Sequence, residues 1–163
     1  RSLAIQICQQ GHEIQGLGEQ AVCVEQMTAK ACRKELQKIR ETIGTVTEEP
    51  GVFFRIPGGE YNNEVLRTIY ACGSYPVAWS VDSMDWKEYE AGELVRQLLQ
   101  SCTIRDGEIL RFHGEGENTG EMVKLLHPRL KEEGYEAVTV SQMVYKDRYR
   151  MTTDGRQIPE KSK

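Results

Sequence analysis

The chain of 163 residues contains no long hydrophobic run, only three histidines and no excess of positive charge. No stretch approaches about 18 consecutive apolar residues, the length that a membrane-spanning helix needs, so the sequence predicts no transmembrane helix. Basic residues number 21 against 25 acidic ones, which argues against nucleic-acid binding through net positive charge. The chain starts at Arg1 without a basic and then apolar leader, so we expect no signal peptide within it.

Five cysteines are present, and no two of them form a C-x-x-C pair. A structural zinc knuckle or a redox motif is therefore not expected, and the thiols are interpreted as buried and free. They are Cys8, Cys23, Cys32, Cys72 and Cys102. Apolar residues make up 39% of the chain and charged residues 28%, as in an ordinary globular domain. We expect one domain over residues 1–145 and a polar, poorly packed tail over residues 146–163.

Helical periodicity marks five segments, most of which are followed by a glycine that can end a helix. In the clearest of them, Thr28 is a candidate N-cap and Gly44 ends the helix. The apolar face of this helix holds Cys32, Leu36, Ile39 and Ile43. The other predicted helices cover residues 1–10, 62–72 and 91–102, and a segment with Met122, Leu126 and Leu130 that Pro128 disturbs.

Short apolar runs between these helices predict strands. The runs are HEIQ (12–15), VFF (52–54), PVAWSV (76–81), EILRF (108–112) and EAVTV (136–140), followed by a helical turn at SQMVY (141–145). Alternating strands and helices predict an α/β fold with parallel strands and crossover helices, either a doubly wound sheet or a barrel.

Polar residues that are unusual for their context follow three of these strands. Arg55 follows VFF, while Asp82, Asp85 and Trp86 follow PVAWSV, and His113 follows EILRF. The carboxyl ends of parallel strands share one rim, so we expect these side chains to converge there on a candidate active site. An imidazole, carboxylates and a guanidinium suit acid–base chemistry on a polar substrate. The alternative is that each serves its own loop, with Asp82 capping a turn.

Four short motifs occur in order along the chain: Gly11-His12-Glu13-Ile14, RIPGG (55–59), DSMDW (82–86) and ILRFH (109–113). Together they resemble the motifs of polysaccharide deacetylases, the NodB-homology domain of carbohydrate esterase family 4. The resemblance covers about residues 3–145. It implies a distorted (β/α) barrel that is incomplete at the N-terminus, because the family's first motif has no counterpart in this chain. An open sheet edge would then be covered by something else, such as a partner chain.

Members of this family hydrolyse N- or O-acetyl groups on chitin-like sugars, peptidoglycan or xylan, with one divalent metal, usually zinc. The resemblance implies that His113 is the catalytic acid. A carboxylate from Asp82 or Asp85 would tune it, and Arg55 would orient the base. The substrate contacts implied are Trp86, Pro57, Tyr61 and Leu110. Relatives are often bacterial and exported or bound to the cell surface.

The sequence departs from the family at the metal site. The positions of the family's two metal-binding histidines correspond to Leu17 and Ala21, whose side chains offer no donor atom. The base and the third metal ligand belong to the missing first motif. Without the metal, Lewis-acid activation of water is lost. We therefore expect no cofactor and little or no deacetylase activity.

Two alternatives stay open. In the first, the chain is an active hydrolase that uses His113 with Asp82 or Asp85 and a rebuilt site for zinc or another divalent metal, with Glu19, Glu115 and Glu117 as further candidate ligands. In the second, it is a non-catalytic module that binds glycan or a protein partner, with aromatic candidates Trp79, Trp86, Tyr61 and Tyr89. The other histidines, His12 and His127, are expected to lie away from the rim.

Overall fold

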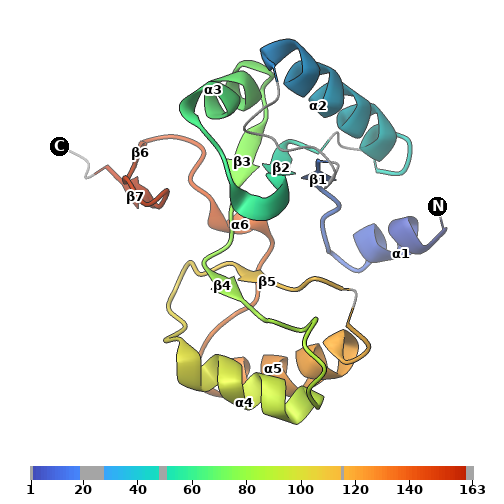
Figure 1. Cartoon of the computed structure of the whole chain (residues 1–163), viewed down its shortest axis with the longest axis vertical. Coiled ribbons are helices and arrows are strands. Elements are labelled where there is room, and N and C mark those ends of the chain that lie inside the picture. Colours follow the sequence, from blue (N-terminus) through green and yellow to red (C-terminus); the bar gives the residue numbers. More distant parts are fainter. Residues whose placement is uncertain (1, 19–27, 48–50, 115, 161–163) are drawn as a thin grey trace. The chain divides into compact units, whose positions relative to one another are not determined.

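The computed structural model describes residues 2–18, 28–47, 51–114 and 116–160 (Figure 1). The chain divides into two compact units, Arg1–Ser80 and Val81–Lys163, and each has its own hydrophobic core. Four residues singled out above lie outside the described ranges: Glu19, Ala21, Cys23 and Glu115.

The first unit holds a three-stranded parallel sheet. Its elements are α1 (Ser2–Gln9), β1 (Gly16–Leu17), α2 (Ala29–Gly44), β2 (Phe53–Arg55), the 3-10 helix η2 (Pro57–Gly59), α3 (Asn63–Ala71) and β3 (Tyr75–Val77). The strand order β1-β2-β3 follows the chain, as in the wall of a (β/α) barrel. The predicted parallel strands with crossover helices are therefore confirmed in this unit.

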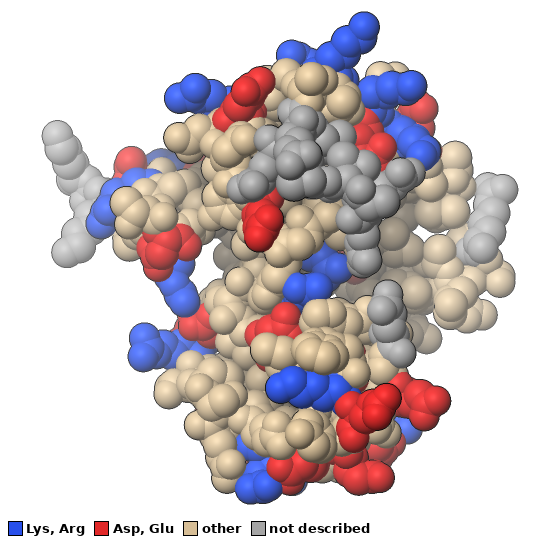
Figure 2. Space-filling model, viewed as in Figure 1, with Lys and Arg blue, Asp and Glu red and all other residues tan. Residues whose placement is uncertain are grey.

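Helices α2 and α3 pack on this sheet through one apolar cluster (Figure 1). Its buried members are Cys32, Leu36, Phe54, Ile56, Val65 and Ile69. Thr28 caps α2 as predicted, because its hydroxyl accepts a hydrogen bond from the Ala31 N–H. Most basic residues of α2 are exposed, and Figure 2 shows Lys and Arg side chains on the surface of the first unit. The amphipathic pattern thus orients α2 with its apolar face on the sheet.

The second unit pairs two helices with a two-stranded parallel sheet. It contains β4 (Val81–Asp82), α4 (Ala91–Ser101), β5 (Leu110–Arg111), α5 (Thr119–Glu132), α6 (Val140–Met143), β6 (Tyr149–Met151) and β7 (Gln157–Pro159). Helices α4 and α5 lie side by side (Figure 1) and close over the strands. The core between them includes the fully buried Val95 and Met122. Helix α5 continues through Pro128, although proline lacks an N–H and removes one bond of the ladder.

The segment predicted as a polar tail forms an antiparallel hairpin of β6 and β7. Within the second unit, Arg156 of the hairpin lies 3.2 Å from the carboxylate of Glu108. The predicted domain boundary at residue 145 stays a prediction.

Three predicted strands are wrong in position. HEIQ is not a strand, and β1 lies just after it at Gly16–Leu17. A Cβ at Gly16 would lie 2.8 Å from Ile39, so glycine permits the close approach of β1 to α2. PVAWSV is split, since β3 ends at Val77 and β4 begins at Val81. The split follows from pairing, because β3 pairs with β2 whereas β4 pairs with β5.

EAVTV is also not a strand. Thr139 caps α6 through a capping box with Gln142, and this local bonding competes with an extended conformation. The predicted helical turn after it is confirmed, although it begins one residue earlier, at Val140.

The described cysteines Cys8, Cys32, Cys72 and Cys102 are free thiols, as predicted. Only Cys32 is fully buried among them, and burial raises the pKa of its thiol. In the described part of the chain, the helices are all too short or too polar to span a lipid bilayer.

Candidate functional site

Two parallel strand ends of the second unit bring three polar side chains together. Strands β4 and β5 pair with Val81 opposite Leu110 and Asp82 opposite Arg111. Residues opposite each other in a sheet point to the same face, and the side chain two positions along an extended segment returns to that face. Asp82, Arg111 and His113 therefore share one face at the carboxyl end of this sheet.

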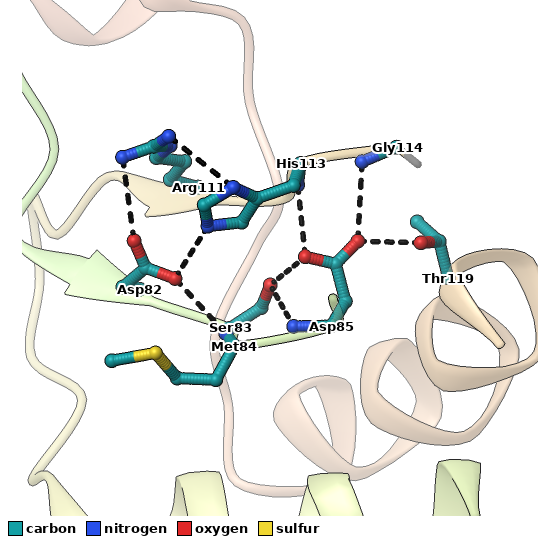
Figure 3. A network of polar contacts seen from close by, with 8 residues as sticks. All are labelled: Asp82, Ser83, Met84, Asp85, Arg111, His113, Gly114 and Thr119. Carbon is teal, nitrogen blue, oxygen red and sulfur yellow. Dashed lines mark hydrogen bonds and ion pairs between the residues drawn. The ribbon is translucent and has the colours of Figure 1, made fainter. Parts of the chain in front are cut away.

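These three side chains form a closed ring of contacts (Figure 3). The Asp82 Oδ1 lies 2.9 Å from His113 Nε2, and the Asp82 Oδ2 lies 3.5 Å from Arg111 Nη1. The Arg111 Nη2 lies 3.2 Å from His113 Nδ1. The side chains are 18–20% exposed, so the ring is shielded from water but can be reached from solvent.

Asp82 also shapes the loop that follows its strand. Its Oδ1 accepts a hydrogen bond from the Met84 N–H at 2.9 Å, which is the Asx-turn geometry. Met84 has a φ of 54°, a left-handed conformation that is uncommon for residues other than glycine. The turn-capping role proposed for Asp82 is thus present together with its contact to His113.

Asp85 is 1% exposed and ties this loop to the loop after His113. Its carboxylate accepts hydrogen bonds from four donors: the Ser83 hydroxyl (2.8 Å), the His113 N–H (2.9 Å), the Gly114 N–H (3.2 Å) and the Thr119 hydroxyl (2.5 Å). Burial by itself raises the pKa of Asp85, but these hydrogen bonds outweigh burial and lower the pKa from 3.8 to about 2. Asp85 is therefore an anionic anchor that positions the backbone of His113, with its oxygens turned to the protein.

Close backbone packing completes this junction. A Cβ at Gly116 would lie 2.0 Å from the Asp85 carbonyl oxygen, so only glycine fits there. The loop of residues 113–119 is consequently held against the loop of residues 82–86.

Trp86 lies beside the ring and is 53% exposed. Its indole meets the His113 ring edge-on, with centroids 6.4 Å apart, and the Lys87 ammonium lies 5.9 Å from the indole centroid. An exposed indole next to buried polar groups is a suitable surface for the apolar face of a sugar.

The remaining predicted site residues fall elsewhere. Arg55, Pro57 and Tyr61 belong to the first unit, where Arg55 ends β2, Pro57 is buried in η2 and Tyr61 is exposed. Leu110 belongs to the second unit, where it is partly buried against the core. The roles assigned to these four residues by resemblance stay predictions.

Leu17, the position that the resemblance aligns with a metal-binding histidine, has no atom that could bind a metal. Leu17 ends β1 directly opposite Arg55, and its side chain is 39% exposed. Over residues 2–18, 28–47, 51–114 and 116–160, no three His, Cys, Asp or Glu side chains gather where they could hold a metal ion. Glu117, a candidate for a rebuilt site, is an exposed loop residue. The donor set of the described residues therefore does not fit a bound zinc, which takes at least three protein ligands.

Sequence reasoning missed Arg111, Ser83 and Thr119. The signal for Arg111 was its position two residues before His113 at a strand end, since alternate residues share a face. Ser83 and Thr119 are short hydroxyl residues whose sequence neighbours do not reveal a bond to Asp85.

Comparison with known proteins finds that the chain is similar to bacterial deacetylases. The family model described as polysaccharide deacetylase matches residues 1–77. The peptidoglycan-N-acetylglucosamine deacetylase PgdA of Listeria monocytogenes is 29% identical over 138 residues, which are 83% of this chain and 28% of that protein. A peptidoglycan-N-acetylglucosamine deacetylase of Bacillus cereus is 26% identical over 147 residues, which are 87% of this chain and 68% of that protein.

Solved structures agree on the fold. BA3943 of Bacillus anthracis, described as a pseudoenzyme of the CE4 family, superposes with a TM-score of 0.78 at 23% identity. The match covers 87% of this chain and 50% of BA3943. A mutant of BA3943 with restored enzymatic activity has a TM-score of 0.77. This chain spans only about half the length of the BA3943 structures and 28% of the length of PgdA.

Proposed function

We propose that this chain, which is similar to polysaccharide deacetylases, recognises acetylated carbohydrate and hydrolyses the acetyl groups slowly or not at all. The observation that carries the proposal is Leu17, an apolar side chain at a strand end where the family resemblance implies a metal-binding histidine. Ala21, the second such position, is apolar by sequence. Hydrocarbon side chains cannot ligate a metal, so the activation of water that the family uses has no support from these positions.

The proposed carbohydrate site lies in the second unit, around His113, Asp82 and Trp86. The exposed Trp86 indole would stack on a sugar ring, and the polar groups beside it would bond to sugar hydroxyl or acetyl groups. Asp85 would act indirectly, because its hydrogen bond to the His113 N–H fixes the loop that carries the imidazole. The relatives act on peptidoglycan N-acetylglucosamine, so N-acetylated glycans are the first ligand class to test.

Binding without turnover is favoured over catalysis by the contrast between these groups. The aromatic and polar surface around Trp86 is present, whereas the metal donors are not found among the described residues. We therefore expect Trp86→Ala to weaken glycan binding by about tenfold, the effect of losing one stacked aromatic contact. The exposed Tyr145 gives a matched control, since Tyr145→Ala removes an aromatic side chain of the same unit without touching the ring of contacts.

The test combines two measurements on the same purified chain. Acetate release is followed with acetylated chito-oligosaccharide, peptidoglycan fragments and acetylxylan, with and without added zinc, and binding of the same glycans is measured by calorimetry. We expect binding that Trp86→Ala weakens, and acetate release no faster than in His113→Ala. Zinc-dependent release that His113→Ala abolishes would instead establish the active hydrolase with a rebuilt metal site. Absence of binding to all of these glycans would refute the carbohydrate site.

Two further expectations accompany this proposal. The relatives are bacterial peptidoglycan deacetylases, which supports a site of action at the bacterial cell surface. A partner chain over an open sheet edge stays a prediction, and the mass of the purified chain in solution, measured by light scattering, tests it.

A further inference from the structure

We propose that Arg111 is a positioning residue that fixes the neutral His113 ring in the tautomer with its proton on Nε2. A guanidinium carries N–H donors and no acceptor. The Arg111 Nη2 lies 3.2 Å from His113 Nδ1, so Nδ1 must be the acceptor of this hydrogen bond. In a neutral imidazole the other nitrogen then carries the proton, and Nε2 donates it to Asp82 Oδ1 at 2.9 Å.

The sheet itself places Arg111 for this role. Asp82 is the residue opposite Arg111 in the β4–β5 pair, and its Oδ2 lies 3.5 Å from Arg111 Nη1. Arg111 and His113 are two residues apart at the end of β5, so their side chains lie on the same face. The fork of the guanidinium can therefore reach both the carboxylate and the imidazole, as Figure 3 shows.

The consequence is that both nitrogens of His113 are occupied by groups of the protein. A general acid or base must place a ring nitrogen within hydrogen-bond reach of the substrate. His113 offers such a nitrogen only after it gives up Arg111 or Asp82. Arg111 thus supplies a reason for slow turnover that is separate from Leu17. This consequence rests on the proposed function, whereas the tautomer does not depend on whether a glycan binds.

The tautomer can be read in the unmodified chain. Long-range ¹H–¹⁵N NMR of the ¹⁵N-labelled protein, recorded at a pH where the imidazole is neutral, separates protonated from unprotonated ring nitrogens, and the His113→Gln spectrum identifies the signals. We expect an unprotonated Nδ1 and a protonated Nε2. A protonated Nδ1, or a mixture of the two neutral tautomers, would overturn the proposal.

A chemical probe tests the role of Arg111 directly. Diethyl pyrocarbonate acylates an imidazole nitrogen that has a free lone pair, and His12 and His127 are exposed internal references. In Arg111→Met the Nδ1 lone pair is released. We expect modification of His113 relative to these references to rise by roughly ten- to a hundredfold, the factor that one hydrogen bond from a charged donor represents. Arg105→Met, a change at an exposed arginine of the same unit, should leave the ratio unchanged.

An unchanged ratio in a folded Arg111→Met variant would overturn the proposal, and the NMR result on the unmodified chain decides the question if the variant does not fold. Neither measurement uses carbohydrate or acetate. A chain with the expected tautomer that binds no glycan would therefore refute the proposed function alone, and glycan binding with the opposite tautomer would refute this inference alone.

Discussion

The carboxyl ends of the two parallel sheets differ in the side chains that they carry. In the first unit the paired strand ends present Leu17, Arg55 and Val77. In the second unit they present Asp82 and Arg111, with His113 two residues further on. Both sheets are parallel, one with three strands and the other with two, so the comparison concerns the side chains at the strand ends. The ends of parallel strands can thus carry different side chains in two parts of one chain.

Each core is formed mostly by helix residues, although residues next to the strand ends also contribute to it: Phe54 and Ile56 in the first unit, and Val81 in the second. The first core is built on Leu36, Val65 and Ile69, and the second on Leu94, Val95 and Met122. These residues come from the helix faces packed on the strands.

The largest expected loss of stability comes from substitutions in the two hydrophobic cores. Ile69→Ala in the first core and Leu94→Ala in the second should each lower the free energy of unfolding by about 2–5 kcal/mol, because each leaves a cavity in a fully packed site. Urea unfolding followed by fluorescence measures both. Leu3→Ala, at a residue that is 66% exposed, is the control and should change stability by less than about 0.5 kcal/mol. A loss below about 1 kcal/mol in either core variant would contradict the prediction.

The second effect concerns the anchor beneath the polar strand ends. Asp85→Asn should lower the free energy of unfolding by about 2–3 kcal/mol, because the amide cannot accept the four hydrogen bonds that the carboxylate accepts. The folded pKa of about 2 lies below the ordinary 3.8. The carboxylate therefore stabilises the fold fully above pH of about 4, and this contribution is lost as the pH falls toward 2. Unfolding of both proteins between pH 7 and pH 2 measures it.

If the charge of Asp85 stabilises the fold, the difference in unfolding free energy between the unmodified chain and Asp85→Asn should become smaller as the pH falls. A difference that is constant over this range would mean that Asp85 acts through packing rather than through its charge.

The smallest effect on stability comes from making the polar strand end apolar and the apolar strand end polar. Asp82→Leu should lower the free energy of unfolding by about 1–2 kcal/mol, because it leaves Arg111 and His113 without their shared carboxylate. Leu17→His should change stability by less than about 0.5 kcal/mol, since the side chain is partly exposed at the end of its strand. Thermal unfolding of the pair measures both. Equal losses of stability in the two variants would contradict the prediction that Asp82 contributes more to stability than Leu17 does.

The helices were predictable from sequence because their signals are local. Thr28 and Asn62 cap α2 and α3, and Gly73 follows α3 with a φ of 68°. The residues that begin and end these helices therefore lie within or next to the helices themselves. The strands were less predictable because they are short and depend on partners far along the chain. Nothing within PVAWSV indicates that its first half pairs with β2 and its last residue with β5.

The candidate site was predictable in part for the same reason. Asp82 and His113 were found because polar residues at strand ends converge in parallel folds. The different tasks of Asp82 and Asp85 could not be read from sequence, since they depend on which carboxylate is buried and which faces the imidazole.

The strand order β1-β2-β3 also bears on how the chain assembles. Each strand pairs with its neighbour in sequence, so the loops closed on pairing are shorter than they would be if the strand order departed from the chain order. Phe53 of β2 pairs with Tyr75 of β3 across η2 and α3, whereas Gly16 of β1 pairs with Phe54 across the longer segment that contains α2. Loop closure therefore favours β2, α3 and β3 as the first part to form, and the strand that carries Leu17 joins a sheet already in place.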